Sequence, residues 1–133
     1  DVDGAQFRYI LTGKPEGRTR VFLNGGMNTL EMWMDYVDAL ADTGRVLLFD
    51  YPQQLRTNQA LVAGMHAFFA AVKGKILLIL PDQDFFSGQM QQDLIRLMHE
   101  PEIRYVSGGH LSTVLKTEDY IRTIRAFLAG QPD

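Results

Sequence analysis

An aspartate and a histidine, whose side chains can take part in acid–base catalysis, each follow a short apolar run in this chain. Asp84 comes after the run Lys75–Leu80, and His110 comes after Ile103–Val106. A carboxylate that accepts a hydrogen bond from an imidazole orients the ring and supports its positive charge, so such a pair can serve as a general base. Asp82, in the same loop, is the competing candidate for the carboxylate. Asp84 can also act simply as the cap of the helix that follows it.

A glycine pair and three serines complete the set of chemically useful positions. Gly25 and Gly26 precede an expected helix, so their N–H groups can face a developing oxyanion, or the pair can be only the tight turn that starts the helix. Ser87, Ser107 and Ser112 supply hydroxyl groups, but none of them lies on a strand-to-helix elbow. We therefore leave the nucleophile unassigned.

Composition excludes several other kinds of site. The chain has no cysteine, which excludes thiol nucleophiles, disulfides and zinc–thiolate centres and is compatible with the cytoplasm, where we expect the protein. We expect neither a metal nor a cofactor, because no His/Asp/Glu cluster has ligand spacing. His66 and His99 are expected to be solvated or to compensate a helix dipole. The formal net charge of −3, without a Lys/Arg cluster, argues against nucleic acid as a partner. No apolar run reaches the ~18 residues of a membrane span.

The elements that must position these residues alternate between strands and helices. Gln6–Leu11 and Arg18–Leu23 are β-prone, and the Gly- and Pro-containing connection between them predicts an N-terminal hairpin. Helices with one apolar face are predicted from Asn28 to about Ala41, Thr57 to Val72, Ser87 to His99 and Thr117 to Ala129. Further strands are predicted at Arg45–Asp50, Lys75–Leu80 and Ile103–Val106.

This alternation predicts one α/β domain of residues 1–133 with a doubly wound, mainly parallel sheet. Ligands of such sheets bind beyond the carboxyl ends of the strands, where Asp84, His110 and the glycine pair are expected to meet. A flavodoxin-like nucleotide binder fits the same strand order, but the chain has neither a G-x-G-x-x-G nor a Walker loop.

Four stretches of the sequence carry a family resemblance when they are taken in order. They are Val21–Gly26 followed by Trp33, Leu47–Pro52, Leu77–Asp84, and Tyr105–His110 followed by a helix that ends Ala126-Phe127-Leu128. Together they cover nearly the whole chain and resemble the α/β-hydrolases. The resemblance implies that Asp84 is the triad acid, His110 the base and Gly26 a donor to the oxyanion hole. Asn24 stands where the family usually has histidine.

The sequence departs from this family at the nucleophile. The family carries a serine on a G-x-S-x-G elbow before the acid-bearing strand. Here a predicted helix ends at Val72, Lys73 opens the next strand, and no such motif exists. Either a nucleophile and cap segment was deleted, or the chain joins two pieces of a longer protein at about Val72–Lys73. If the deletion is real, Lys75–Leu80 can pair beside Val21–Leu23 in a truncated fold.

Two functions follow from this resemblance. The first is hydrolysis of an ester or similar small acyl substrate by a Ser-His-Asp triad whose serine is absent, so that the chain as it stands is expected to be inactive. The second is a non-catalytic, hydrolase-derived binding module or homo-oligomeric scaffold, which would use the surface that the lost segment leaves open.

Overall fold

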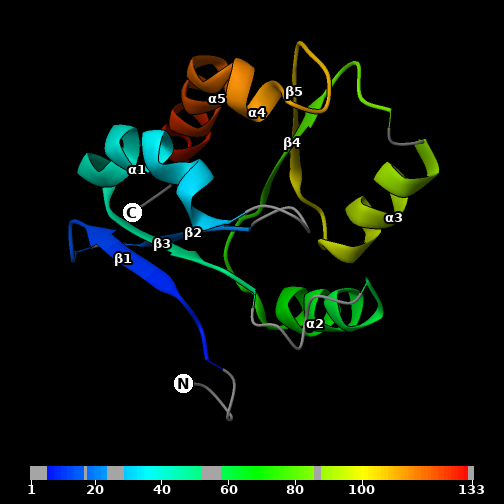
Figure 1. The fold of residues 1–133 in the computed structure, drawn as a ribbon, viewed down its shortest axis with the longest axis horizontal. Helices are drawn as coiled ribbons and strands as arrows, with labels where there is room; N and C mark the ends of the chain where they lie inside the picture. The colour runs from blue at the N-terminus through cyan, green and yellow to red at the C-terminus, as the bar shows by residue number, and fades with distance from the viewer. Residues whose placement is uncertain (1–5, 17, 24–28, 52–57, 86–87, 132–133) are drawn as a thin grey trace. The chain divides into compact units, whose positions relative to one another are not determined.

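The computed structural model describes residues 6–16, 18–23, 29–51, 58–85 and 88–131, with residues 58–62 described by their backbone alone. The chain divides into two compact units, Asp1–Val62 with Pro132–Asp133 and Ala63–Gln131. Each unit combines helices with a small sheet, so the predicted mixture of α and β structure is confirmed (Figure 1). The prediction of a single domain remains a prediction.

The first unit contains a three-stranded sheet whose central strand is the last of the three along the chain. Its strands are β1 (Tyr9–Gly13), β2 (Thr19–Phe22) and β3 (Arg45–Phe49), in the order β1-β3-β2. β1 runs antiparallel to β3, with Leu11 opposite Leu47. β2 runs parallel to β3, with Val21 opposite the same Leu47.

The predicted N-terminal hairpin is therefore wrong, because β3 separates the two strands that were expected to pair. β3 buries Val46 and Leu48 completely, and the most apolar strand gains most from a position with a partner on each side. The chain leaving β1 also bonds toward β3, since the Lys14 N–H donates to the Gly44 carbonyl at 3.2 Å. Gly13 has a φ of +85°, and a Cβ atom there would lie 2.2 Å from the Gly44 oxygen, so this approach requires glycine.

The predicted first helix is confirmed as a continuous helical segment with tighter turns at its two ends. Its parts are η1 (Leu30–Trp33), α1 (Met34–Leu40) and η2 (Ala41–Thr43). Leu30, Val37 and Leu40 are buried as their spacing predicts. Tyr36 is also buried, which the spacing did not predict, and its ring centre lies 5.1 Å from that of Trp33. An aromatic cluster thus completes the core of this unit.

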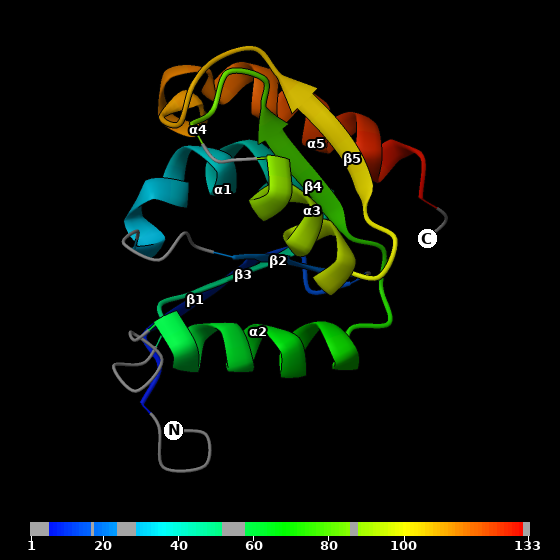
Figure 2. The same ribbon diagram turned by 90° about the vertical axis from the view of Figure 1, so that its right-hand side faces the viewer.

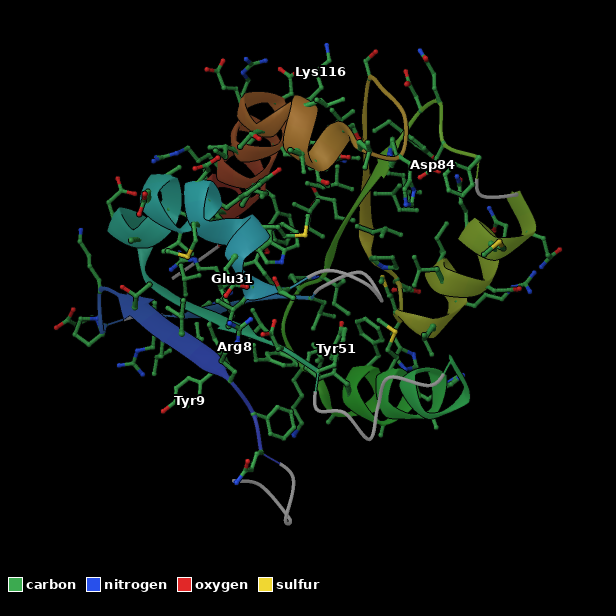
Figure 3. All side chains as sticks on the ribbon, viewed as in Figure 1. Arg8, Tyr9, Glu31, Tyr51, Asp84 and Lys116 are labelled. Atoms are coloured by element: carbon green, nitrogen blue, oxygen red, sulfur yellow. The ribbon has the colours of Figure 1, made fainter. Side chains whose placement is uncertain are left out.

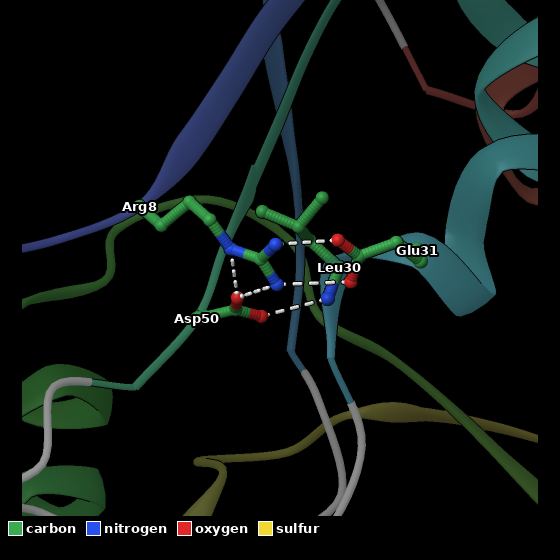
Figure 4. Close-up of polar contacts among 4 residues, drawn as sticks. All are labelled: Arg8, Leu30, Glu31 and Asp50. Carbon is green, nitrogen blue, oxygen red and sulfur yellow. Dashed lines mark hydrogen bonds and ion pairs between the residues drawn. The ribbon is translucent and has the colours of Figure 1, made fainter.

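An ion cluster joins three segments of the first unit (Figure 4). Arg8, just before β1, donates from Nε to Asp50 Oδ2 at 2.6 Å and from Nη1 to Glu31 Oε1 at 2.5 Å. Asp50 follows β3 directly, and its second oxygen accepts the Leu30 N–H at 2.7 Å. The cluster therefore ties the start of η1 to the sheet.

We expect this cluster to make the first unit sensitive to acid. Hydrogen bonds from the Thr29 hydroxyl and from Arg8 lower the pKa of Glu31 from 4.5 to about 2. A carboxylate whose pKa is lower in the folded state contributes stability above its unfolded pKa and loses it as the pH falls toward the folded value. Between about pH 4.5 and pH 2, stability should therefore fall more steeply in the wild type than in Glu31→Gln.

Urea unfolding at several pH values, followed by fluorescence of Trp33, the single tryptophan, measures this difference. Glu16→Gln, which changes another exposed glutamate of the same unit, should retain the wild-type pH dependence. Equal pH dependence in Glu31→Gln and in the wild type would show that the cluster contributes nothing.

The second unit is a two-stranded parallel sheet covered by one long helix. This helix, α5 (Thr117–Ala129), packs on both strands (Figure 2). Its Tyr120 and Ile124 are buried. The helix predicted from Ser87 to His99 was expected to bury an apolar face that includes Met90, but α3 (Gly88–Leu97) buries no side chain, so this expectation is wrong. The physical reason is that α5, and not α3, covers the apolar side chains of the strands. The elements are α2 (Asn58–Ala71), which crosses the boundary between the units, β4 (Leu77–Pro81), α3 (Gly88–Leu97), β5 (Glu102–Val106), α4 (Ser112–Leu115) and α5 (Thr117–Ala129).

The described strands form two sheets, one of three strands and one of two. β4 pairs with β5 in parallel, with Leu77 opposite Glu102 and Pro81 opposite Val106. The described strand pairings give no evidence for a single doubly wound sheet with Lys75–Leu80 beside Val21–Leu23, which stays a prediction. Within the described ranges, no helix has both the length and the apolar character that crossing a membrane requires.

Candidate active site

Two loops follow the carboxyl ends of β4 and β5, and hydrogen bonds hold them together. The Asp82 N–H donates to the Val106 carbonyl at 3.0 Å, and the Gln83 N–H donates to the Gly108 carbonyl at 2.9 Å. In the opposite direction, the Gly108 N–H donates to Asp82 Oδ1 at 2.9 Å. The pairing of the two strands therefore continues into the loops and fixes the backbone on both sides of the candidate site.

These loops bring Asp84, which is labelled in Figure 3, close to His110. The Nδ1 atom of His110 lies 3.3 Å from both Oδ1 and Oδ2 of Asp84, near the long end of the hydrogen-bonding range. The Asp84 side chain is 7% exposed and that of His110 is 45% exposed. A nearly buried carboxylate thus faces one nitrogen of a half-exposed imidazole.

The sequence did not decide whether Asp82 or Asp84 meets the histidine, and the structure gives the two carboxylates different partners. Asp82 uses its side chain to hold the Gly108 backbone, whereas Asp84 meets the imidazole. The Nδ1–H tautomer of His110 is the one that can donate to Asp84, and it leaves Nε2 as an unprotonated acceptor. An oriented acceptor nitrogen is what a general base needs. The assignment of the two residues as acid and base remains a prediction.

An aromatic side chain lies against the imidazole. The ring of Phe85 lies 4.5 Å from the ring of His110 between centres, at an interplanar angle of 40°. Phe85 is 75% exposed, so its ring is not part of the core. Leu111, Val114 and Leu115, which follow His110 along the chain, are also largely exposed.

A pair of buried hydroxyl groups lies behind this loop, and the sequence did not predict it. Ser112 is 2% exposed and Tyr120 is 4% exposed, and their oxygens lie 2.7 Å apart. Burial raises the pKa of Tyr120, the hydrogen bond to Ser112 opposes this shift, and the negative charge of Asp84 adds to it. The Tyr120 hydroxyl is therefore neutral at ordinary pH and lies within electrostatic reach of the candidate site.

The contact between Ser112 and Tyr120 argues against Ser112 as a nucleophile. The Ser112 hydroxyl is buried and engaged with Tyr120, so a substrate carbonyl cannot reach it without rearrangement. Ser107 is exposed in the loop after β5. Ser87 lies outside the described residues, and so do Gly25 and Gly26, the predicted oxyanion loop.

The other histidines stand apart from this site in the sequence and are exposed. His66 lies within α2, and His99 follows α3 with a left-handed φ of 51°. Across the described part of the chain, no three His, Asp or Glu side chains gather in a way that could hold a metal ion.

Comparisons with protein-family models, with curated proteins and with solved structures found no match to this chain.

Proposed function

We propose that this chain carries the acid–base pair of a serine-type α/β-hydrolase that acts on an ester or a similar small acyl substrate. The observation that supports the proposal most directly is the placement of His110 Nδ1 at 3.3 Å from both carboxylate oxygens of Asp84. The two residues come from loops after adjacent parallel strands, which is where ligands of α/β sheets bind.

Each residue then has a role that its position allows. A serine hydroxyl attacks the carbonyl carbon of the substrate, His110 takes the hydroxyl proton on Nε2, and Asp84 holds the ring and supports its charge. The family resemblance assigns the oxyanion to backbone N–H groups near Gly26, which lies outside the described residues. The serine itself is supplied by a segment that joins the chain at about Val72–Lys73.

The intact mass of the protein from its natural source tests this proposal. A mass well above 15.1 kDa, together with labelling by a serine-reactive fluorophosphonate, supports the complete hydrolase. A mass of 15.1 kDa without labelling means that the nucleophile is lost, and the hydrolase is then ruled out for this protein. Removing a nucleophile lowers turnover by several orders of magnitude even when its partners remain.

A second candidate function, a non-catalytic binding or self-associating module, is favoured by the exposed apolar side chains around His110. Phe85, Leu111, Val114 and Leu115 all belong to the second unit and leave most of their surface uncovered. Groups of exposed apolar side chains often mark interaction sites. Analytical ultracentrifugation of the 15.1 kDa protein tests for self-association. A dimer that Leu115→Glu dissociates supports the scaffold, and a monomer argues against self-association.

A further inference from the structure

The loop that carries His110 depends on Ser112 for its shape. The Ser112 N–H donates to the Gly109 carbonyl at 2.9 Å, which closes a tight turn with His110 inside it. Gly108, on the other side of the histidine, has a left-handed φ of +140°, and a Cβ atom there would lie only 3.0 Å from the Ser112 Cβ. The position of Ser112 therefore determines where the backbone of His110 lies.

Tyr120 in turn contacts the side chain of Ser112. Its hydroxyl meets the Ser112 hydroxyl at 2.7 Å, and both side chains are buried. Tyr120 belongs to α5, which packs on both β4 and β5, the strands whose loops carry the two site residues. This side-chain hydrogen bond thus connects the helix that covers the sheet to the turn that contains His110.

We propose that Tyr120 is a positioning residue of the candidate site, holding the His110 turn through Ser112 so that Nδ1 faces Asp84. The inference rests on the proposed function, because it concerns the same acid–base pair. Burying two hydroxyl groups without partners is costly, whereas burying them as a bonded pair specifies one geometry. Packing alone would be satisfied by phenylalanine at this place, so the hydroxyl group of Tyr120 has the positioning role.

The tautomer of the His110 ring is the property that reports this role. Asp84 faces Nδ1, so the wild type should hold its neutral imidazole mainly in the Nδ1–H form, visible in the ¹⁵N chemical shifts of the ring. Tyr120→Phe removes the hydroxyl and releases the turn. The ratio of the Nδ1–H to the Nε2–H form should then fall by about fivefold, the factor that one hydrogen bond of ordinary net strength contributes.

A matched control lies on the same helix. The Thr123 hydroxyl donates to the Asp119 carbonyl at 2.8 Å, so Thr123→Val removes a hydroxyl from α5 without changing the bond to Ser112. This variant should keep the wild-type tautomer ratio. If it lowers the ratio as much as Tyr120→Phe does, the effect is a general loosening of the helix and the inference is wrong.

Ser112→Ala tests whether Tyr120 acts on the His110 turn through Ser112. It also serves in place of Tyr120→Phe if that variant does not fold. It should lower the tautomer ratio to the same degree, and the double variant should show no further loss, because both substitutions remove one bond. An additive loss in the double variant overturns the route through Ser112.

The failure of this inference differs from the failure of the proposed function. A wild type in the Nδ1–H form whose ratio Tyr120→Phe leaves unchanged contradicts the positioning role alone. A wild type mainly in the Nε2–H form contradicts the Asp84–His110 pair itself, and the positioning role then fails with it.

Discussion

His110→Ala is expected to lower the hydrolysis of p-nitrophenyl acetate by this chain by about 10²-fold, the lower end of what a positioned acid–base group contributes. The chain is expected to lack the triad reaction, but a slow residual hydrolysis of this activated ester remains, in which the half-exposed His110 takes a proton from the attacking water. Asp84 supports the imidazolium that forms, at 3.3 Å from Nδ1. The initial rate of p-nitrophenolate release measures the effect.

The other two histidines provide matched controls for this experiment. His66 and His99 are exposed, so each is as accessible to an activated ester as His110 is. His66→Ala and His99→Ala should retain the wild-type rate, and Asp84→Asn should lose most of the rate that His110→Ala loses. If all three histidine variants lose activity equally, the hydrolysis is ordinary imidazole chemistry at the surface and the site has no special role.

Leu48→Ala is expected to lower the free energy of unfolding of the first unit by about 2–5 kcal/mol, the usual cost of truncating a fully buried leucine. Leu48 has an exposed fraction of 0% and lies in β3, the central strand between β1 and β2. Leu48 lies opposite Ile10 of β1 and Phe22 of β2, so strands on both sides limit how far the cavity can collapse. Urea unfolding followed by Trp33 fluorescence gives the measurement.

Leu11→Ala removes the same atoms from the edge of the same sheet. Leu11 is about half exposed, so the expected loss is about 1 kcal/mol or less. If the two variants lose equal stability, β3 is not the centre of the core, and the strand order β1-β3-β2 is contradicted.

The elements of this fold could be predicted from the sequence, but their pairing could not. The last helix begins at Thr117 and ends at Ala129, as its apolar spacing predicts. The expected hairpin failed because a Gly- and Pro-rich connection indicates only that the chain turns. It does not indicate which strand the chain meets next, and β1 meets β3 about 35 residues along the chain.

For the candidate site, too, some residues could be predicted from the sequence and others could not. Asp84 and His110 could be found because each follows an apolar strand, and parallel strands present their carboxyl ends together. Ser112 and Tyr120 could not, because the helix between them is interrupted at Lys116, whose φ is −128°. A spacing of eight residues across such a break has no fixed geometry, so helical periodicity cannot predict the contact.

The hydrogen bonds that join the loops after β4 and β5 have a consequence for how the protein folds. Asp84 and His110 are 26 residues apart, and the bond between Asp82 and Gly108 spans the same separation. Closing a loop of that length costs entropy before any contact compensates for it. Neither loop is therefore expected to adopt its final conformation before β4 and β5 pair. During refolding, the environment of His110 should therefore change in the same kinetic phase in which β4 and β5 pair.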